Sequence, residues 1–217
     1  MSGHFDDATL ETRPTGVINR MNTRAITWGA IGAAITAWGF FAERDTFFQS
    51  YLIGYMYWMY ITLGSLALVM VAHLSGGAWG IVSRRVFEAA VRTLPVMAIL
   101  FLPIAFNLPH LYEWARPEAL NDPGIQTKAA YLNPGFFYAR AIGYFVIWIG
   151  LGFTLSGWGA KQDAAAPVIP GPEDRKFRVL SGPGLVLFMI TITFMSVDWM
   201  MSLDPHWTST IFGVLFV

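Results

Sequence analysis

Long apolar segments separated by shorter polar ones dominate the chain from residue 25 onward. Five membrane spans can be drawn from them, four with about the 17–25 residues that a transmembrane helix needs and one with a shorter apolar core. They are Ala25–Phe41, about Phe48–His73, Leu94–Leu108, about Phe136–Trp158 and Leu180–Met201. Because the third apolar core is short, we expect its helix to begin upstream, near Phe87. The pattern predicts an all-α fold, a polytopic transmembrane helix bundle with five complete spans.

A sixth apolar run opens at about Trp207 and stops after about ten residues, too few to cross a bilayer. We therefore expect this chain, which ends at Val217, to be the N-terminal part of a longer protein. The expected organisation is a polar cytoplasmic segment over residues 1–24, followed by a transmembrane bundle over residues 25–217 that includes the start of a sixth span.

Composition agrees with a membrane protein, since 55% of the residues are hydrophobic, 13% are charged and the mean hydropathy is +0.49. Soluble domains carry about 25% charged residues. The net charge is zero, and nothing suggests a nucleic-acid partner. The chain has no cysteine, which excludes disulfides, thiolate zinc sites, cysteine-ligated iron–sulfur clusters and thioether-linked haem on this chain.

The distribution of Lys and Arg outside the spans predicts the orientation. Ten of them lie in the N-terminal segment and in the second and fourth loops, and three lie in the other loops. By the positive-inside rule the N-terminus is expected to be cytoplasmic. Asp198 and His206 would then lie toward the outer face, and His73 and Glu88 toward the cytoplasm.

Two groups of charges have local explanations. Arg84, Arg85, Glu88 and Arg92 follow one another at helical spacing, which predicts a surface ion-pair cluster. Arg140 lies one turn inside the fourth span, so we expect it to extend outward to the membrane surface. The loop Pro109–Gly135 and the linker Gly159–Phe177 are rich in turn residues and are expected to be exposed.

Asp198 is the strongest candidate for chemistry, because an acid at the centre of a membrane helix costs about 2.5–3.5 kcal/mol. It lies near the outer end of its span, which lowers that cost. Two interpretations stay open: a proton-exchanging carboxylate or quinone headgroup partner, and a hydrogen-bonded acid that orders the following turn. Thr191 lies on the same helical face and would extend a polar track inward.

Histidines supply the remaining candidates. His206 follows Asp204-Pro205 and would either relay protons or anchor that turn by hydrogen bonds, and His73 has similar standing at the other membrane face. Glu88 completes the candidates for a proton path or a quinone-proximal site. The sequence contains no catalytic triad and no metal-ligand spacing, so no catalytic or metal-binding residue is predicted.

Three stretches resemble one family: HLSGGAWG with RR-x-x-EA over His73–Ala89, LPVMAILFLPI over Leu94–Ile104, and SVDWMMSLDPHWTSTIFG over Ser196–Gly213. The chain is similar to the N-terminal half of the F subunit of bacterial alternative complex III, a quinol:cytochrome c oxidoreductase. That family is related to the membrane subunits of polysulfide reductases.

The resemblance implies a multi-pass subunit of the bacterial inner membrane without a redox centre or bound cofactor of its own, with quinone or quinol bound at the level of the complex. Its partners would be a paralogous quinol-binding membrane subunit and subunits carrying iron–sulfur clusters and haem c. Such a subunit would support quinone binding, proton translocation or both, without itself being catalytic. The alternatives are a proton or solute transport protein that works alone, and a purely structural scaffold.

Overall fold

The structure is a computed structural model that describes residues 15–42, 44–76, 78–165 and 175–216. Regular secondary structure in these residues is helical throughout, without a strand. Five stretches are long and apolar enough to cross a membrane: Asn19–Ala42, Thr46–Ser75, Ser83–Phe106, Pro134–Gln162 and Arg175–Leu203. The predicted all-α bundle with five spans is therefore confirmed, and the chain is a multi-pass membrane protein.

The chain divides into two compact units, Met1–Phe47 and Phe48–Val217. The first unit contains α1 (Thr15–Ala42) and the first residues of α2 (Arg44–Ser75). Its ring contacts gather at the turn between these helices, where Phe40 meets Phe47 edge-on with centroids 5.8 Å apart. Residues 1–14 of the predicted polar segment lie outside the described residues.

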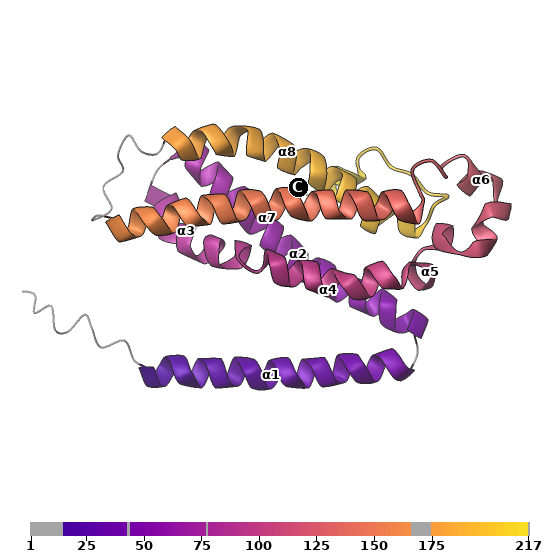
Figure 1. Cartoon of the computed structure of the whole chain (residues 1–217), viewed down its shortest axis with the longest axis horizontal. Helices are drawn as coiled ribbons and strands as arrows, with labels where there is room; N and C mark the ends of the chain where they lie inside the picture. Colours follow the sequence, from indigo (N-terminus) through magenta and orange to yellow (C-terminus); the bar gives the residue numbers. More distant parts are fainter. Residues whose placement is uncertain (1–14, 43, 77, 166–174, 217) are drawn as a thin grey trace, which may run out of the picture. The chain divides into compact units, whose positions relative to one another are not determined.

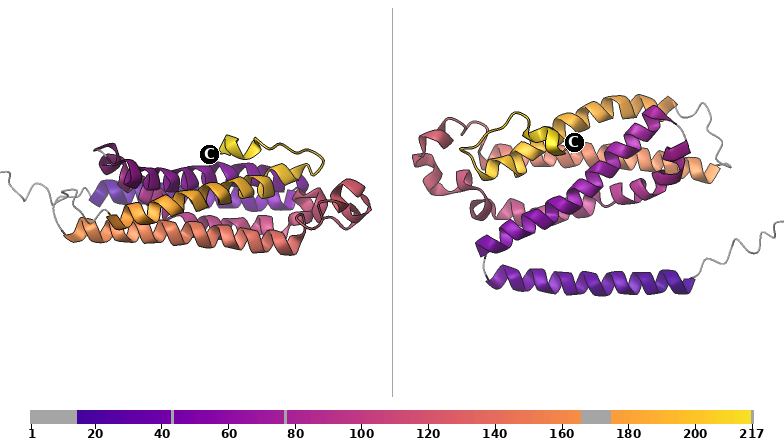
Figure 2. Two further views of the ribbon diagram at one scale, coloured as in Figure 1. Left: turned by 90° about the horizontal axis from the view of Figure 1, so that it is seen from above. Right: turned by 180° about the vertical axis from the view of Figure 1, so that it is seen from behind.

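In the second unit, α7 (Pro134–Ala165) is the central helix. It packs against α8 (Arg175–Trp199) on one flank and against α3 (Ala78–Val91) and α4 (Leu94–Phe106) on the other (Figure 1). The rest of α2 crosses these helices obliquely (Figure 2). Large side chains fill the space between the helices, and the most deeply buried include Trp148, Trp199, Phe188, Met59 and Leu66.

The third span consists of two helices rather than one. We expected a single helix from about Phe87, but α3 ends at Val91 and α4 begins at Leu94. Pro95 accounts for the break, because its ring has no N–H to donate to the Val91 carbonyl and would collide with it. Proline is tolerated in the first turn of the new helix, and Pro95 lies there.

The loop between α4 and α7 is largely helical in short pieces. It contains α5 (Leu108–Leu111), η2 (Glu113–Ala115), η3 (Pro117–Asn121) and α6 (Pro123–Gln126), at one end of the bundle (Figure 1). Turn chemistry sets the ends of these pieces: the Asp122 carboxylate accepts a hydrogen bond from the Gly124 amide at 2.7 Å and so caps α6.

The predicted end of the fourth span needs correction. Asn133 caps α7 by accepting from the Phe136 amide at 2.9 Å, and this helix continues to Ala165 instead of ending before Gly159. The helices on either side take up residues 159–165 and 175–177 of the predicted linker, and residues 166–174 lie outside the described residues.

The expected start of a sixth helix at Trp207 is also different. After α8 come η5 (Met201–Leu203), a turn, and the 3₁₀ helix η6 (Phe212–Phe216), which lies alongside α8 (Figure 2). The close approach requires a glycine, because a Cβ at Gly213 would lie 2.8 Å from Cγ2 of Thr193.

Candidate functional site

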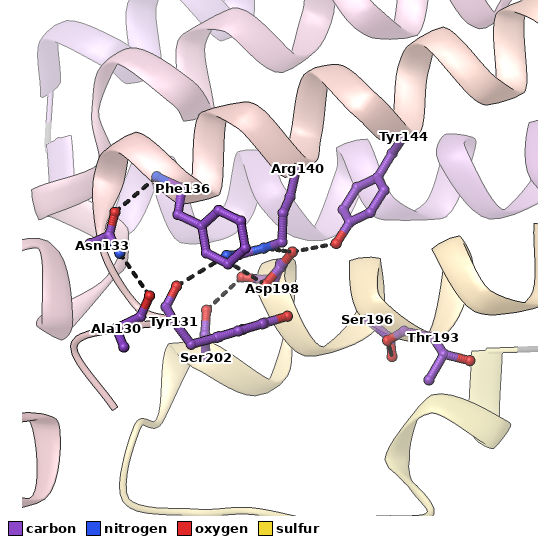
Figure 3. A network of polar contacts seen from close by, with 10 residues as sticks. All are labelled: Ala130, Tyr131, Asn133, Phe136, Arg140, Tyr144, Thr193, Ser196, Asp198 and Ser202. Carbon is purple, nitrogen blue, oxygen red and sulfur yellow. Dashed lines mark hydrogen bonds and ion pairs between the residues drawn. The ribbon is translucent and has the colours of Figure 1, made fainter. Parts of the chain in front are cut away.

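The most organised polar site joins α7 to α8 through an ion pair. Arg140 Nε donates to Asp198 Oδ2 at 2.8 Å, and Arg140 Nη2 donates to Asp198 Oδ1 at 2.9 Å (Figure 3). The Asp198 side chain is 1% exposed and that of Arg140 is 10% exposed. This is the two-pronged geometry that matches a guanidinium to a carboxylate.

The expectation that Arg140 reaches outward to the membrane surface is wrong. Its third nitrogen, Nη1, donates to the Tyr131 carbonyl at 3.1 Å, and the guanidinium lies 3.9 Å from the ring centroid of Tyr131 and 4.2 Å from that of Phe136. A buried arginine with a carboxylate, a carbonyl and two aromatic rings around it has its charge balanced inside the protein.

Asp198 has two further hydrogen-bonding contacts. Tyr144 donates its hydroxyl to Asp198 Oδ2 at 2.6 Å, and Ser202 Oγ donates to the Asp198 backbone carbonyl at 2.5 Å. The carboxylate thus accepts three hydrogen bonds from α7, and its backbone fixes the turn that follows α8 (Figure 3). Of the two interpretations of Asp198, these contacts favour the acid that orders the turn.

Thr191 lies on the same face of α8 as Asp198, as predicted, and it also contacts α7. Trp148 Nε1 on α7 donates to Thr191 Oγ1 at 2.9 Å, while Thr191 donates to the Leu187 carbonyl at 2.8 Å. Tyr144 and Trp148 are stacked, with ring centroids 5.7 Å apart. The polar row on this face of α8 thus forms a hydrogen-bonded seam with α7, through Trp148 at Thr191 and through Arg140 and Tyr144 at Asp198.

His206 contacts the loop before α7. Its Nε2 lies 3.1 Å from Asp122 Oδ2, with the two side chains 54% and 35% exposed. The Asp204 carboxylate accepts from the backbone amides of His206 and Trp207 at 3.0 and 3.3 Å, and Lys128 Nζ donates to the Pro205 carbonyl at 2.6 Å. These contacts support the interpretation in which His206 anchors the turn.

His73 lies in the last turn of α2, and Glu88 lies against Gly159 late in α7. Asp198 instead pairs with Arg140 near the start of α7, so His73 and Glu88 lie toward the opposite end of the bundle from Asp198. The His73 ring stacks on Phe177 of α8 with centroids 4.5 Å apart. The site residues predicted from the sequence therefore fall into two groups. Asp198, His206 and, further inward, Thr191 belong to the end of the bundle where α7 begins and α8 ends. His73 and Glu88 belong to the end where α7 ends and α8 begins.

The predicted surface ion-pair cluster on α3 is wrong for Glu88, which is 6% exposed. Arg84 Nε lies 3.4 Å from Glu88 Oε1, so the predicted pairing itself is present. The carboxylate is buried because α7 presents a glycine opposite it: a Cβ at Gly159 would lie 2.5 Å from Glu88 Oε1. Arg92 Nη2 also reaches α7, where it donates to the Ser156 carbonyl at 3.4 Å.

Two tyrosines in the loop before α7 lie close to the Arg140–Asp198 pair. Tyr112 donates its hydroxyl to the Trp199 carbonyl at 3.1 Å. Burial, and then the nearby charge of Asp198, raise the pKa of Tyr112 well above its usual value. Burial and the same carboxylate also raise the pKa of Tyr131, against a smaller lowering by Arg140. Both phenols therefore stay protonated at physiological pH.

The sequence interpretation missed Arg140 and Tyr144 as members of this site. A signal was present, because Arg140, Tyr144 and Trp148 recur every four residues and so share one face of α7. What the sequence does not give is the partner, since 58 positions separate Arg140 from Asp198. Among the described residues, no group of three or more His, Asp or Glu side chains could hold a metal ion.

A scan against protein-family models finds no match to this chain, and a search of the curated proteins finds no relative.

Proposed function

We propose that this chain is an integral membrane subunit of a respiratory quinol:cytochrome c oxidoreductase of the alternative complex III type. In that role it supports quinone binding or proton translocation by its partners without a redox centre of its own. The observation that carries the proposal is the resembling stretch Ser196–Gly213, which includes Asp198, Ser202 and the turn at Asp204. The same stretch supplies one side of the best-organised polar site in the protein.

The geometry of that site favours support through structure. Asp198 already accepts hydrogen bonds from Arg140 and Tyr144, and a carboxylate in a two-pronged pair is poorly placed to exchange protons or to receive a quinol hydroxyl. The subunit would therefore support quinone binding or proton translocation indirectly, by fixing α7, α8 and the following turn beside the groups of its partners that carry out these steps.

Localisation follows from the same proposal. The five apolar spans make a multi-pass membrane protein, and the resemblance favours the bacterial inner membrane with a cytoplasmic N-terminus. The site at Asp198 would then face the outer side, where the subunits that carry haem c and iron–sulfur clusters would be placed.

Purification tests the proposal. The chain is tagged in its native host and extracted in mild detergent, and the visible spectrum of the purified material is recorded with and without dithionite. We expect haem c bands, iron–sulfur absorbance and quinol:cytochrome c activity to elute with the tagged chain. A chain that elutes alone, and that catalyses proton or solute uptake after reconstitution into liposomes, would overturn the proposal in favour of an independent transport protein.

The scaffold alternative has its own test in the same complex. The variants Asp198→Asn, Thr191→Val and His206→Gln are each made, and only complexes that assemble are assayed. If assembled complexes keep full quinol oxidation and full proton release, the chain is a scaffold and takes no part in either process. A loss of turnover in assembled complexes supports the proposed supporting role.

A further inference from the structure

A pocket of about 320 Å³ lies at the end of the bundle where α7 begins and α8 ends. Its lining comes from residues 127–132, just before α7, and from residues 197–208, at the end of α8 and in the turn beyond it. Both segments adjoin the ends of membrane-spanning stretches, so the pocket lies at the membrane boundary. Ligand pockets usually measure about 300–1,000 Å³, so this one has the size for a small headgroup and part of a chain.

The pocket carries one positive and one negative side chain, Lys128 and Asp204. Lys128 Nζ donates one hydrogen bond, to the Pro205 carbonyl, and an ammonium group has three donors. From the described residues Asp204 accepts two backbone amides, both at Oδ1, which leaves Oδ2 for a ligand. Within the described part of the chain no ion pair joins Lys128 to Asp204, so the two charges border the same space without neutralising each other.

The remaining walls suit hydrocarbon. Leu132, Val197, Met201 and Trp207 line the pocket, and Trp207 is 48% exposed. An exposed tryptophan at the end of a span is typical of the interfacial zone, where lipid headgroups meet acyl chains. The pocket therefore offers a cation, an anion and apolar surface at the depth where a phospholipid has a phosphate, a headgroup and the start of its chains.

We propose that this pocket binds a zwitterionic phospholipid with a primary ammonium headgroup, of the phosphatidylethanolamine type. The phosphate contacts the Lys128 ammonium, the headgroup ammonium donates to Asp204 Oδ2, and an acyl chain lies on Met201 and Trp207. A purely anionic headgroup would leave Asp204 facing negative charge, and a choline headgroup has no N–H to donate to it. The inference is independent of the proposed respiratory function.

Native mass spectrometry of the purified, delipidated protein tests this site. The protein is purified with any subunits that accompany it and titrated with phosphatidylethanolamine, phosphatidylglycerol or phosphatidylcholine of identical acyl chains. We expect the first phosphatidylethanolamine to bind at about tenfold lower concentration than the other two lipids, because its charged headgroup makes one more charged hydrogen bond in the pocket.

Two substitutions separate the two ends of the headgroup. Lys128→Gln should weaken all three lipids about tenfold, since each carries a phosphate. Asp204→Asn keeps a side-chain oxygen for the backbone amides of the turn. It should weaken phosphatidylethanolamine and abolish the preference for it, without weakening phosphatidylglycerol or phosphatidylcholine. Arg116→Gln and Glu118→Gln remove matched exposed charges from the same loop and should leave all three affinities unchanged.

A third variant, Met201→Trp, fills the pocket and keeps both charges, so it should lower the binding of every lipid. It tests the pocket independently if a charge variant fails to fold. The proposal is overturned if the unmodified protein binds the three lipids equally, or if Asp204→Asn keeps the preference for phosphatidylethanolamine. Equal binding would indicate ordinary annular lipid. Loss of this preference leaves the test of the respiratory function, co-purification with haem c, unaffected.

Discussion

At the scale of single residues, Arg140 and Asp198 illustrate what a charge beside a membrane span requires. Each would be costly alone in an apolar segment, and each is buried in the structure. Together they form a two-pronged pair. Asp198 also accepts a hydrogen bond from Tyr144, and Arg140 also donates one to the Tyr131 carbonyl. The stability of this arrangement depends on both members being present, because a buried charge without its partner is far worse than either a pair or an apolar replacement.

Asp198→Asn should therefore destabilise the protein strongly. The substitution leaves the Arg140 guanidinium buried without a counter-charge, and removing one partner of a buried pair costs about 3–5 kcal/mol. Thermal unfolding in detergent, followed by tryptophan fluorescence, measures the loss.

The matched control replaces both members by apolar residues, as in Arg140→Met with Asp198→Leu. The double variant should recover most of the stability that Asp198→Asn loses, since no charge is then left unpaired. If Asp198→Asn is as stable as the unmodified protein, the ion pair does not contribute to the stability of the fold. That result would favour the proton-exchange interpretation of Asp198.

Gly159 offers a second test at this scale. In Gly159→Ala the new Cβ would lie 2.5 Å from Glu88 Oε1, so the buried carboxylate has to move away from α7. We expect Gly159→Ala to be less stable than Gly157→Ala by about 1–3 kcal/mol, because a Cβ at Gly157 meets nothing within 4 Å. Both variants gain the same helix propensity.

Shortening Glu88 provides the check on this mechanism. In an Glu88→Ala background the difference between Gly159→Ala and Gly157→Ala should disappear, since the group that the new methyl displaces is gone. A difference that persists would mean that the cost at residue 159 comes from the helix packing as a whole, not from the carboxylate.

At the scale of elements, the seam between α7 and α8 depends on hydrogen bonds as well as on aromatic packing. Trp148 is fully buried, and its indole N–H has Thr191 as its acceptor. Thr191→Val keeps the shape of the side chain but leaves this N–H without an acceptor, which costs about 1–3 kcal/mol.

Thr193→Val is the matched control for this prediction. Thr193 lies two residues further along α8, is exposed, and donates to the carbonyl of Met189 in its own helix. Its replacement should change the unfolding temperature much less than Thr191→Val does. Equal effects would show that the loss arises within α8 and not at its contact with α7.

The elements were largely predictable, for a physical reason. A helix that crosses a membrane must satisfy every backbone group internally over a fixed thickness, so a long apolar run leaves little choice of structure. The exceptions also have local causes. Pro95 breaks the helix of the third span, and the Asp204 turn is followed by a 3₁₀ helix where the start of a sixth span was expected.

The candidate site was much less predictable than the elements. Asp198 could be recognised because an acid in an apolar segment is rare, whereas the position of its partner depends on how α7 and α8 pack. Because Arg140 lies one turn inside its span, the sequence is also satisfied by a side chain that extends outward to the membrane surface. Only the packing of α7 against α8 excludes that explanation. The burial of Glu88 likewise depends on a glycine of another helix, Gly159.

At the scale of the whole molecule, the orientation in the membrane is the prediction that most affects function. The Lys and Arg distribution predicts a cytoplasmic N-terminus, which places the turn at Asp204 outside. A periplasmically active reporter fused after Leu203 should be active, and the same reporter fused after Gln162 should be silent. The reverse pattern would put the Asp198 site on the cytoplasmic side and remove the support that the proposed function draws from its location.

The Arg140–Asp198 pair also constrains how the chain enters the membrane. The ribosome makes Arg140 58 residues before Asp198, so α7 reaches the insertion machinery with an arginine whose partner does not yet exist. Only when α8 follows can the two spans leave the translocation channel as a neutral hairpin. A chain interrupted between them would present an unpaired arginine to lipid, which is costly within a membrane.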